Sequence, residues 1–315
     1  MYIFFKQRPI WAWGGLTVII SSLWGLTQIV VQISYWRRGF FDMIQKMVNN
    51  GGDVSTIYLG MLDFGKWAVL YIFIVAITDY LTQRWLLSWR ESIMFYYHAH
   101  WLTLRTIEGS SQRLQEDCKL ATRLLESIGE GAISGLMTLV AFGPILWTLS
   151  KDVPELLFFN VNGGLMWIAF IWALGGTIVL LWLGRRLYGL EYTNQLAEAS
   201  LRKELVYGED FTDRATPSQI NILWKDVYIN YRRLFFEFFK FGLGKWTYLQ
   251  ISVLVPILII SPSIALGAIS WGIIMQLLDV FSRVENSMQY LLRSWTSIVE
   301  YLAVRKRLKE FEGNI

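Results

Sequence analysis

Long stretches without a charged residue alternate with charge-rich stretches along this 315-residue chain. The charge-free stretches are 9–36, 131–150 and 156–184. Three further apolar segments carry only scattered charges: 67–83, 234–260 and 264–308. About 20 consecutive apolar residues suffice for a helix to cross a bilayer. The pattern therefore predicts six membrane-crossing helices.

The charge-rich stretches between these segments contain few glycines or prolines, so we expect several helices to continue well beyond the bilayer. The proline within Ser261–Ser263 is expected to separate the last two helices. We predict an all-α integral membrane protein with one transmembrane domain, residues 1–315. Its expected helices are 9–38, 65–108, 122–150, 156–205, 226–260 and 264–308.

Composition supports the membrane class. Hydrophobic residues make up 54% of the chain and charged residues 17%, whereas soluble domains are about 25% charged. The 16 tryptophans agree, because indoles favour membrane interfaces. The first apolar segment is too long for a signal peptide and has no small-residue cleavage pattern.

The basic residues predict an orientation. With both termini in the cytoplasm, 24 of the 29 lysines and arginines fall on the cytoplasmic side. The net charge of +4 thus reflects membrane topology, and no nucleic-acid-binding motif is present in the sequence.

The sequence offers little support for a disulfide, a metal site, a nucleotide site or a catalytic nucleophile. The single Cys118 excludes an internal disulfide, and His98 and His100 point to different faces of a helix, so we expect no metal site. The sequence contains neither a phosphate-binding loop nor a G-x-S-x-G nucleophile motif. We therefore expect no cofactor and no enzymatic activity in this chain.

Carboxylates cluster where the apolar segments end. One cluster holds Glu108, Glu116, Asp117, Glu126 and Glu130, and the other holds Glu191, Glu198, Glu204, Glu209 and Asp210. Glu126 and Glu130 share a helix face because they are four residues apart. Two such ladders facing a cavity would pass protons along. Alternatively, they are solvated helix faces paired with neighbouring arginines.

Three residues within the apolar segments are also candidates. Asp79 and Asp279 lie at membrane depth, where ionisable residues are costly and usually functional, although either can pair with a neighbour. Phe142 precedes Gly143 and Pro144, which suggests a bend that borders a cavity. The plain alternative for Phe142 is a side chain that faces lipid or core.

Several long motifs resemble the SbmA/BacA family of bacterial peptide transporters. They are IEGSSQRLQED (107–117), MTLVAFGPILWTLS (137–150), VPEL (153–156), GLEYTNQLAEASLRKELVYGEDFTDRATP (189–217) and FSRVENSMQYLLRSWTSIVEYLAVRKRLKEFE (281–312). The resemblance extends from about residue 9 to residue 312. It implies an inner-membrane homodimer with intertwined subunits and a fold similar to an ABC exporter without its nucleotide-binding domain. It also implies uptake of peptides, many of them cationic, driven by the proton gradient.

The resemblance assigns roles to particular residues. Proton coupling is expected at Glu116, Glu126, Glu198 and Glu209, and a transport role at Tyr207 and Phe142. Glu108, Glu130, Asp79 and Asp279 are further candidates for the same chemistry. The expected partners are a second copy of the chain, membrane lipid, protons and peptides. With the resemblance, a proton-linked role for the carboxylates is favoured over solvated faces.

Two departures from the family pattern stand out. Longer members carry an additional N-terminal membrane helix, and this chain begins almost directly at the next one. Phe41 also stands where the family often has a tyrosine. The first departure puts the substrate range of the longer members in doubt for this chain.

Two other functions compete with peptide uptake. The first is the membrane subunit of an ATP-driven ABC transporter whose ATPase is encoded separately. The second is a receptor or scaffold, which is disfavoured because such a protein is expected to carry a sensor domain or long tail, and the sequence ends at Ile315.

Overall fold

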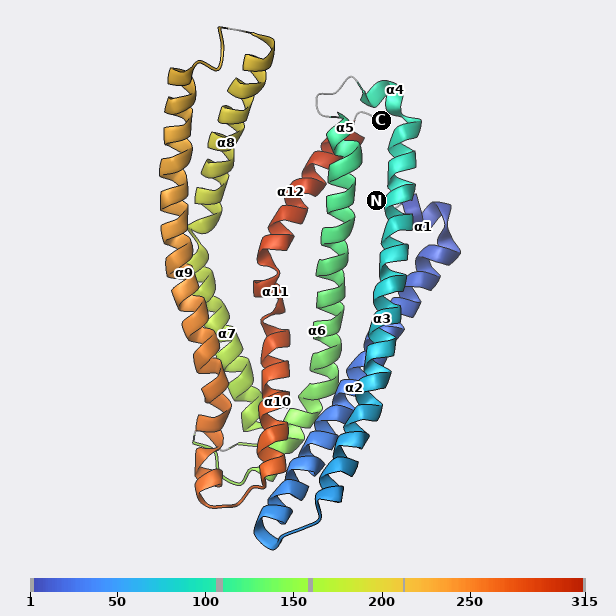
Figure 1. The fold of residues 1–315 in the computed structure, drawn as a ribbon, viewed down its shortest axis with the longest axis vertical. Helices are drawn as coiled ribbons and strands as arrows, with labels where there is room; N and C mark the ends of the chain where they lie inside the picture. Colours follow the sequence, from blue (N-terminus) through green and yellow to red (C-terminus); the bar gives the residue numbers. More distant parts are fainter. Residues whose placement is uncertain (1–2, 106–109, 158–160, 212, 314–315) are drawn as a thin grey trace. The chain divides into compact units, whose positions relative to one another are not determined.

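The computed structural model describes residues 3–105, 110–157, 161–211 and 213–313, and in these residues all regular structure is helical. The first elements are α1 (Ile3–Gln7), α2 (Pro9–Asn50), α3 (Val54–Ala99), α4 (Trp101–Leu104), α5 (Ser110–Gln112) and a π-helical turn η1 (Arg113–Asp117). The remaining elements are α6 (Cys118–Asp152), α7 (Gly164–Gly184), α8 (Leu187–Asp210), α9 (Pro217–Ala265), α10 (Trp271–Met288), α11 (Tyr290–Arg293) and α12 (Trp295–Glu312) (Figure 1).

Five helical stretches in the described residues are long and apolar enough to cross a membrane, which confirms a multi-pass helical membrane protein. They are Pro9–Asn50, Val54–Ala99, Leu114–Asp152, Gly164–Glu209 and Pro217–Ala265. The sixth expected helix, 264–308, is divided into α10, α11 and α12, and none of these belongs to that set.

The helix boundary expected at Ser261–Ser263 is wrong. α9 continues through Pro256 and Pro262 to Ala265. Pro262 removes the amide that would bond to the carbonyl of Leu258, and the Ser261 hydroxyl donates to that carbonyl instead (2.8 Å). The chain turns only afterwards, at Gly267, whose φ of +62° suits glycine, and Ser270 then caps α10.

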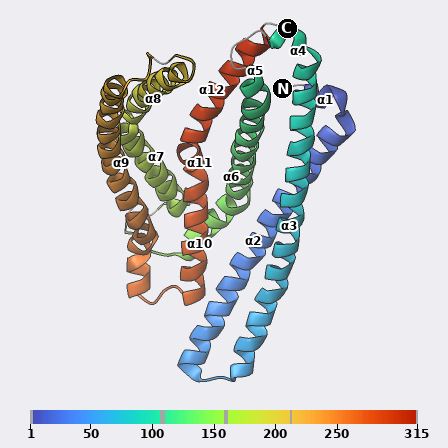
Figure 2. The ribbon, with the colours of Figure 1, turned by 45° about the horizontal axis from the view of Figure 1, so that its top comes forward.

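The chain divides into two compact units, which we describe separately. Unit 1 comprises Met1–Ala173 and Pro256–Ile315, and unit 2 comprises Leu174–Val255. In unit 1, α2 and α3 form a long antiparallel hairpin, and α10 packs against both α2 and α6 (Figures 1 and 2). α1 and the last turns of α12 lie at the end of unit 1 opposite the α2–α3 turn (Figure 1).

Two names are useful for unit 1. The "hairpin end" contains the α2–α3 turn (51–53) and the α9–α10 turn (266–270). The "terminal end" contains α1, α4 and the last turns of α12. The hydrophobic core of unit 1 is aromatic near the terminal end, where Phe4, Trp85 and Trp89 are almost fully buried.

Unit 2 consists of the second half of α7, all of α8 and most of α9. α7 and α9 approach each other closely at glycines: a Cβ at Gly176 would overlap the ring of Tyr248, and one at Gly244 would overlap Leu183. Small residues at such crossings let two membrane helices pack closely.

Candidate functional site

A cavity of about 840 Å³ lies in unit 1 towards its terminal end. Side chains of α1, α2, α3, α6 and α12 line it. The aliphatic part of its wall comes largely from α2, and the polar part from α6 and α12. A cavity of this size, mostly apolar with a few polar groups, is the usual form of a ligand site.

An aromatic wall covers one side of the cavity, made by Phe5, Trp13, Trp85, Trp89 and Tyr96. The rings of Trp85 and Trp89 are 5.2 Å apart, and those of Phe5 and Trp13 are 4.9 Å apart. The indole N–H of Trp85 donates to the carbonyl oxygen of Ala12 (3.0 Å), which fixes the orientation of the ring. Packing and this hydrogen bond therefore hold the wall in place.

A carboxylate pair forms the second wall. Glu126 and Glu130 both line the cavity from α6, and both are half-buried. Their four-residue spacing places them on one helix face, where two negative charges repel each other. A proton on either carboxylate would relieve that repulsion.

A basic wall formed by Arg305 and Lys309 on α12 completes the cavity. Among the residues that the structure describes, neither side chain forms an ion pair with Glu126 or Glu130. Glu312, on the same helix, accepts a hydrogen bond from the Tyr97 hydroxyl (2.7 Å).

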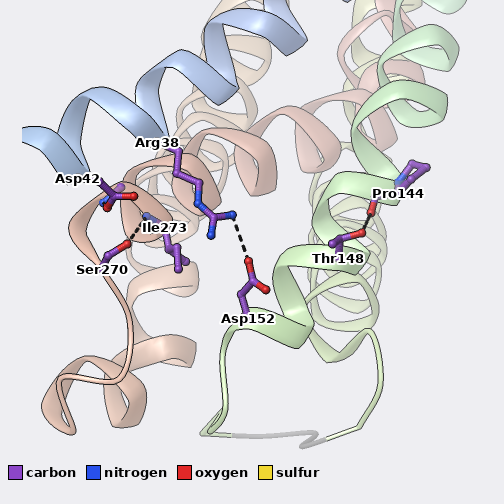
Figure 3. A network of polar contacts seen from close by, with 8 residues as sticks. Arg38, Asp42, Pro144, Thr148, Asp152, Ser270 and Ile273 are labelled. Atoms are coloured by element: carbon purple, nitrogen blue, oxygen red, sulfur yellow. Dashed lines mark hydrogen bonds and ion pairs between the residues drawn. The ribbon is translucent and has the colours of Figure 1, made fainter. Parts of the chain in front are cut away.

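Ion pairs join α2, α6 and α10 at the hairpin end. Asp279 of α10 pairs with Arg37 of α2 (2.7 Å) and with Arg283 one turn further along α10 (2.9 Å), and its side chain is only 12% exposed. Arg38 of α2 reaches Asp152 of α6 (3.1 Å), as Figure 3 shows. These pairs hold three helices together.

Backbone hydrogen bonds tighten the same junction. The N–H of Gly272 donates to Asp42 (2.8 Å) and that of Trp271 donates to Gln45 (2.9 Å), so side chains of α2 satisfy the first amides of α10. Ser270 accepts from the N–H of Ile273 (3.3 Å), which Figure 3 also shows. A Cβ at position 272 would overlap the Arg38 carbonyl and the Asp42 carboxylate, so this contact requires glycine.

Two buried polar side chains near this junction have no hydrogen-bond partner in the described part of the chain. They are Ser34 of α2 and Gln276 of α10, and both are fully buried. Phe142 of α6 is also buried, and the guanidinium of Arg283 on α10 lies 5.4 Å from the centroid of its ring. An amide buried without a partner costs stability.

The carboxylates expected in unit 2 are dispersed along α8. Glu198 is half-buried and Glu209 is exposed. Glu204 accepts from the N–H of Ala215 (3.2 Å) and pairs weakly with Arg214 (3.8 Å). Tyr207 lies between two cations, Arg214 at 5.3 Å and Lys203 at 5.6 Å from its ring centroid.

Of the candidates in unit 1, Glu126 and Glu130 come together, and Glu116 is exposed on η1. Asp79 is exposed on α3 rather than buried, whereas Asp279 is paired and only 12% of its side chain is exposed. Glu108 lies outside the described residues.

Sequence reasoning missed the basic wall of Arg305 and Lys309, and also Gln276. The four-residue spacing of Arg305 and Lys309 was a usable signal for one shared face. In the described residues, no three His, Cys, Asp or Glu side chains gather as a metal site would require.

The fold and the cavity define a multi-pass helical membrane protein with a ligand-sized chamber among its helices. The family model of the SbmA/BacA-like family matches residues 6–315, and the chain belongs to that family, which is a family of membrane transporters.

More distant relatives are ABC transporter proteins. The chain is 23% identical to the inner membrane ABC transporter ATP-binding protein YddA of Escherichia coli K12, over 94% of this chain and 56% of the relative. It is 24% identical to an uncharacterized ABC transporter ATP-binding protein of Synechocystis, over 97% of this chain and 47% of the relative. It is 22% identical to ABC transporter D family member 2 of Arabidopsis thaliana, over 74% of this chain and 34% of the relative. The chain thus spans about half, or less, of the length of these relatives.

Proposed function

We propose that this protein takes up peptides across the bacterial inner membrane as a homodimer, driven by the proton gradient. The observation that carries the proposal is the pair of half-buried carboxylates, Glu126 and Glu130, on one face of α6 at the wall of the cavity. Membership of the SbmA/BacA-like family supports the same conclusion.

In this mechanism, a peptide and a proton enter the cavity from outside. Peptide ammonium and guanidinium groups are attracted to the carboxylate pair, and binding is completed by the aromatic wall. Protonation of the pair reduces the repulsion between Glu126 and Glu130 and so shifts the equilibrium between two conformations. Release of the proton to the cytoplasm resets the pair.

The available energy is sufficient for such a cycle. A driving force of about 150 mV supplies about 3.5 kcal/mol per proton, at about 2.3 kcal/mol per 100 mV. That energy corresponds to an accumulation ratio of about 300-fold for one proton per peptide. Glu116 of unit 1, and Glu198 and Glu209 of unit 2, are proposed to take part in proton coupling as well.

A second function is favoured by the names of the relatives. ATP hydrolysis would drive transport through a nucleotide-binding unit outside these 315 residues, because the relatives named above are ABC transporter proteins and the sequence itself has no phosphate-binding loop. The carboxylate pair Glu126 and Glu130 would then not contribute to driving transport.

Reconstitution separates the two functions. The purified protein is placed in liposomes without ATP, an inward proton gradient is imposed, and entry of a fluorescent cationic peptide is measured. Gradient-dependent entry that an ionophore abolishes supports proton-driven uptake. Entry that is absent without ATP would contradict it.

Variants then test the carboxylate pair. Glu126→Gln and Glu130→Gln are expected to abolish gradient-driven accumulation while the protein remains folded. Glu300→Gln is the matched control, because Glu300 is exposed on α12 and does not line the cavity. Accumulation that persists in both pair variants would remove the pair from the proton path.

A further inference from the structure

Charged groups line the cavity from two helices. The acidic pair lies on α6, whereas Arg305 and Lys309 lie on α12 together with the lining carboxylate of Glu312. The spacing of four residues within each pair places its members on one helix face. Within the described residues, the acidic and basic pairs form no ion pair with one another. The basic groups are therefore available to a ligand.

The cavity is long enough for an extended peptide. Its lining on α3 runs from Thr82 to Tyr96, which is about 21 Å at about 1.5 Å per helical residue. An extended chain advances about 3.3–3.6 Å per residue, so about six residues fit along this wall. Every unmodified peptide of that length carries an ammonium group at one end and a carboxylate at the other.

We propose that Arg305 and Lys309 bind the C-terminal carboxylate of the cargo peptide, while Glu126 and Glu130 receive its cationic groups. This inference rests on the proposed peptide uptake and adds the direction in which the peptide lies. A guanidinium binds a carboxylate through two parallel hydrogen bonds, and capture of a terminal carboxylate is a recurrent mode of peptide recognition. The aromatic wall of the same cavity accommodates apolar side chains.

The neighbouring groups of α12 favour this role over a purely structural one. Glu312, the acidic lining residue of α12, accepts a hydrogen bond from Tyr97. Lys306 is adjacent in sequence and equally cationic, but it does not line the cavity. Position on the cavity wall, rather than charge alone, therefore distinguishes Arg305 and Lys309.

Two peptides that differ only at the C-terminus test the proposal. Each is a hexapeptide with two lysines and two apolar residues, one ending in a free carboxylate and the other in an amide. Binding to the full-length protein in detergent is measured by isothermal titration calorimetry. The free acid is expected to bind about tenfold more tightly, since a hydrogen bond to a charged group is worth at least about that factor.

Variants assign the difference to α12. Arg305→Gln and Lys309→Gln are expected to lower the affinity for the acid towards that for the amide, and to leave the amide unchanged. Arg305→Lys is expected to restore part of the difference. Lys306→Gln, which removes the same charge outside the cavity, is expected to keep the full difference. Thermal unfolding of each variant checks that it is folded.

Two results overturn the carboxylate site: equal binding of acid and amide by the unaltered protein, or equal weakening of both by Arg305→Gln. If both peptides nevertheless enter liposomes under a proton gradient, peptide uptake stands and only the carboxylate site fails. If neither peptide binds or enters, the proposed cargo class fails together with this site.

Discussion

The two ends of unit 1 share α2 and α6, yet they differ in how their charges are paired. At the hairpin end, Arg37, Arg38, Asp152 and Asp279 are matched in ion pairs between α2, α6 and α10. At the terminal end, Arg8 and Glu91 form an exposed ion pair outside the cavity lining, whereas Glu126 and Arg305 line the cavity without an ion pair in the described residues. The charges of the hairpin end therefore hold helices together, and those of the cavity are left to a ligand.

This contrast has a physical basis in helix spacing. Gly272 lets α10 approach α2 so closely that side chains of α2 bind the first amides of α10. At the terminal end, large rings such as Trp85 and Trp89 stand between the helices and leave space beside them. The contacts at the hairpin end join three helices, so they are the place to disturb.

The largest effect is expected from Gly272→Val. The new side chain would overlap the Arg38 carbonyl and Asp42, and such overpacking costs about 3 kcal/mol. Thermal unfolding in detergent should show a clear fall in Tm. Gly39→Ala is the control, because a Cβ there meets no atom within 4 Å. A Tm of Gly272→Val equal to that of the unaltered protein would mean that the two helices are not in close contact.

Asp279→Asn is expected to have the next largest effect. It leaves Arg37 and Arg283 without their carboxylate at a site that is only 12% exposed, and we expect a loss of about 2 kcal/mol. The exposed pair Asp63–Lys66 provides the control, since Asp63→Asn should cost no more than about 0.5 kcal/mol. Similar losses in the two variants would show that the Asp279 pairs are solvated.

The sequence revealed the helices because their apolar segments are long, and it revealed Glu126 and Glu130 because they are close in sequence. The hairpin-end junction was not predictable in the same way. Arg37 and Asp279 belong to different helices at opposite ends of the chain. No local sequence pattern predicts that these two residues form an ion pair. Asp279 was a candidate only because a carboxylate at membrane depth is unusual.

The basic wall was missed for a related reason. Arg305 and Lys309 occur in a charge-rich stretch, where solvated side chains are the normal expectation. Their position on a cavity depends on how α12 packs against α6, which is a tertiary contact. The end of α9 was missed because one hydroxyl, that of Ser261, offsets the loss of a backbone donor at Pro262.

A gain in stability is expected from Gln276→Met. Gln276 is fully buried with both polar side-chain atoms unpartnered in the described residues, and Met keeps its shape without the buried amide. We expect the folded hairpin-end junction to become more stable by about 1 kcal/mol, and the Tm in detergent to rise. Phe281→Leu, at a buried apolar position of α10, should instead lower Tm. A lower Tm in Gln276→Met would show that the amide has partners.

The smallest effect concerns Asp53, which caps α3 at the hairpin end. Its carboxylate accepts hydrogen bonds from the hydroxyl (2.5 Å) and the N–H (3.2 Å) of Ser55, and these lower the pKa of Asp53 below its ordinary value. A lowered pKa means that the folded first turn favours the ionised form, so its contribution is present above the ordinary pKa and is lost as pH falls through the lowered one. Hydrogen exchange of the first α3 amides should therefore accelerate relative to its intrinsic rate at acidic pH.

The control is Asp53→Asn, which keeps an acceptor but cannot ionise. The protection of its first α3 amides should not change with pH in this range, and the cavity lining should be unaffected in either protein. Equal pH dependence in both proteins would place the titrating group elsewhere at the hairpin end.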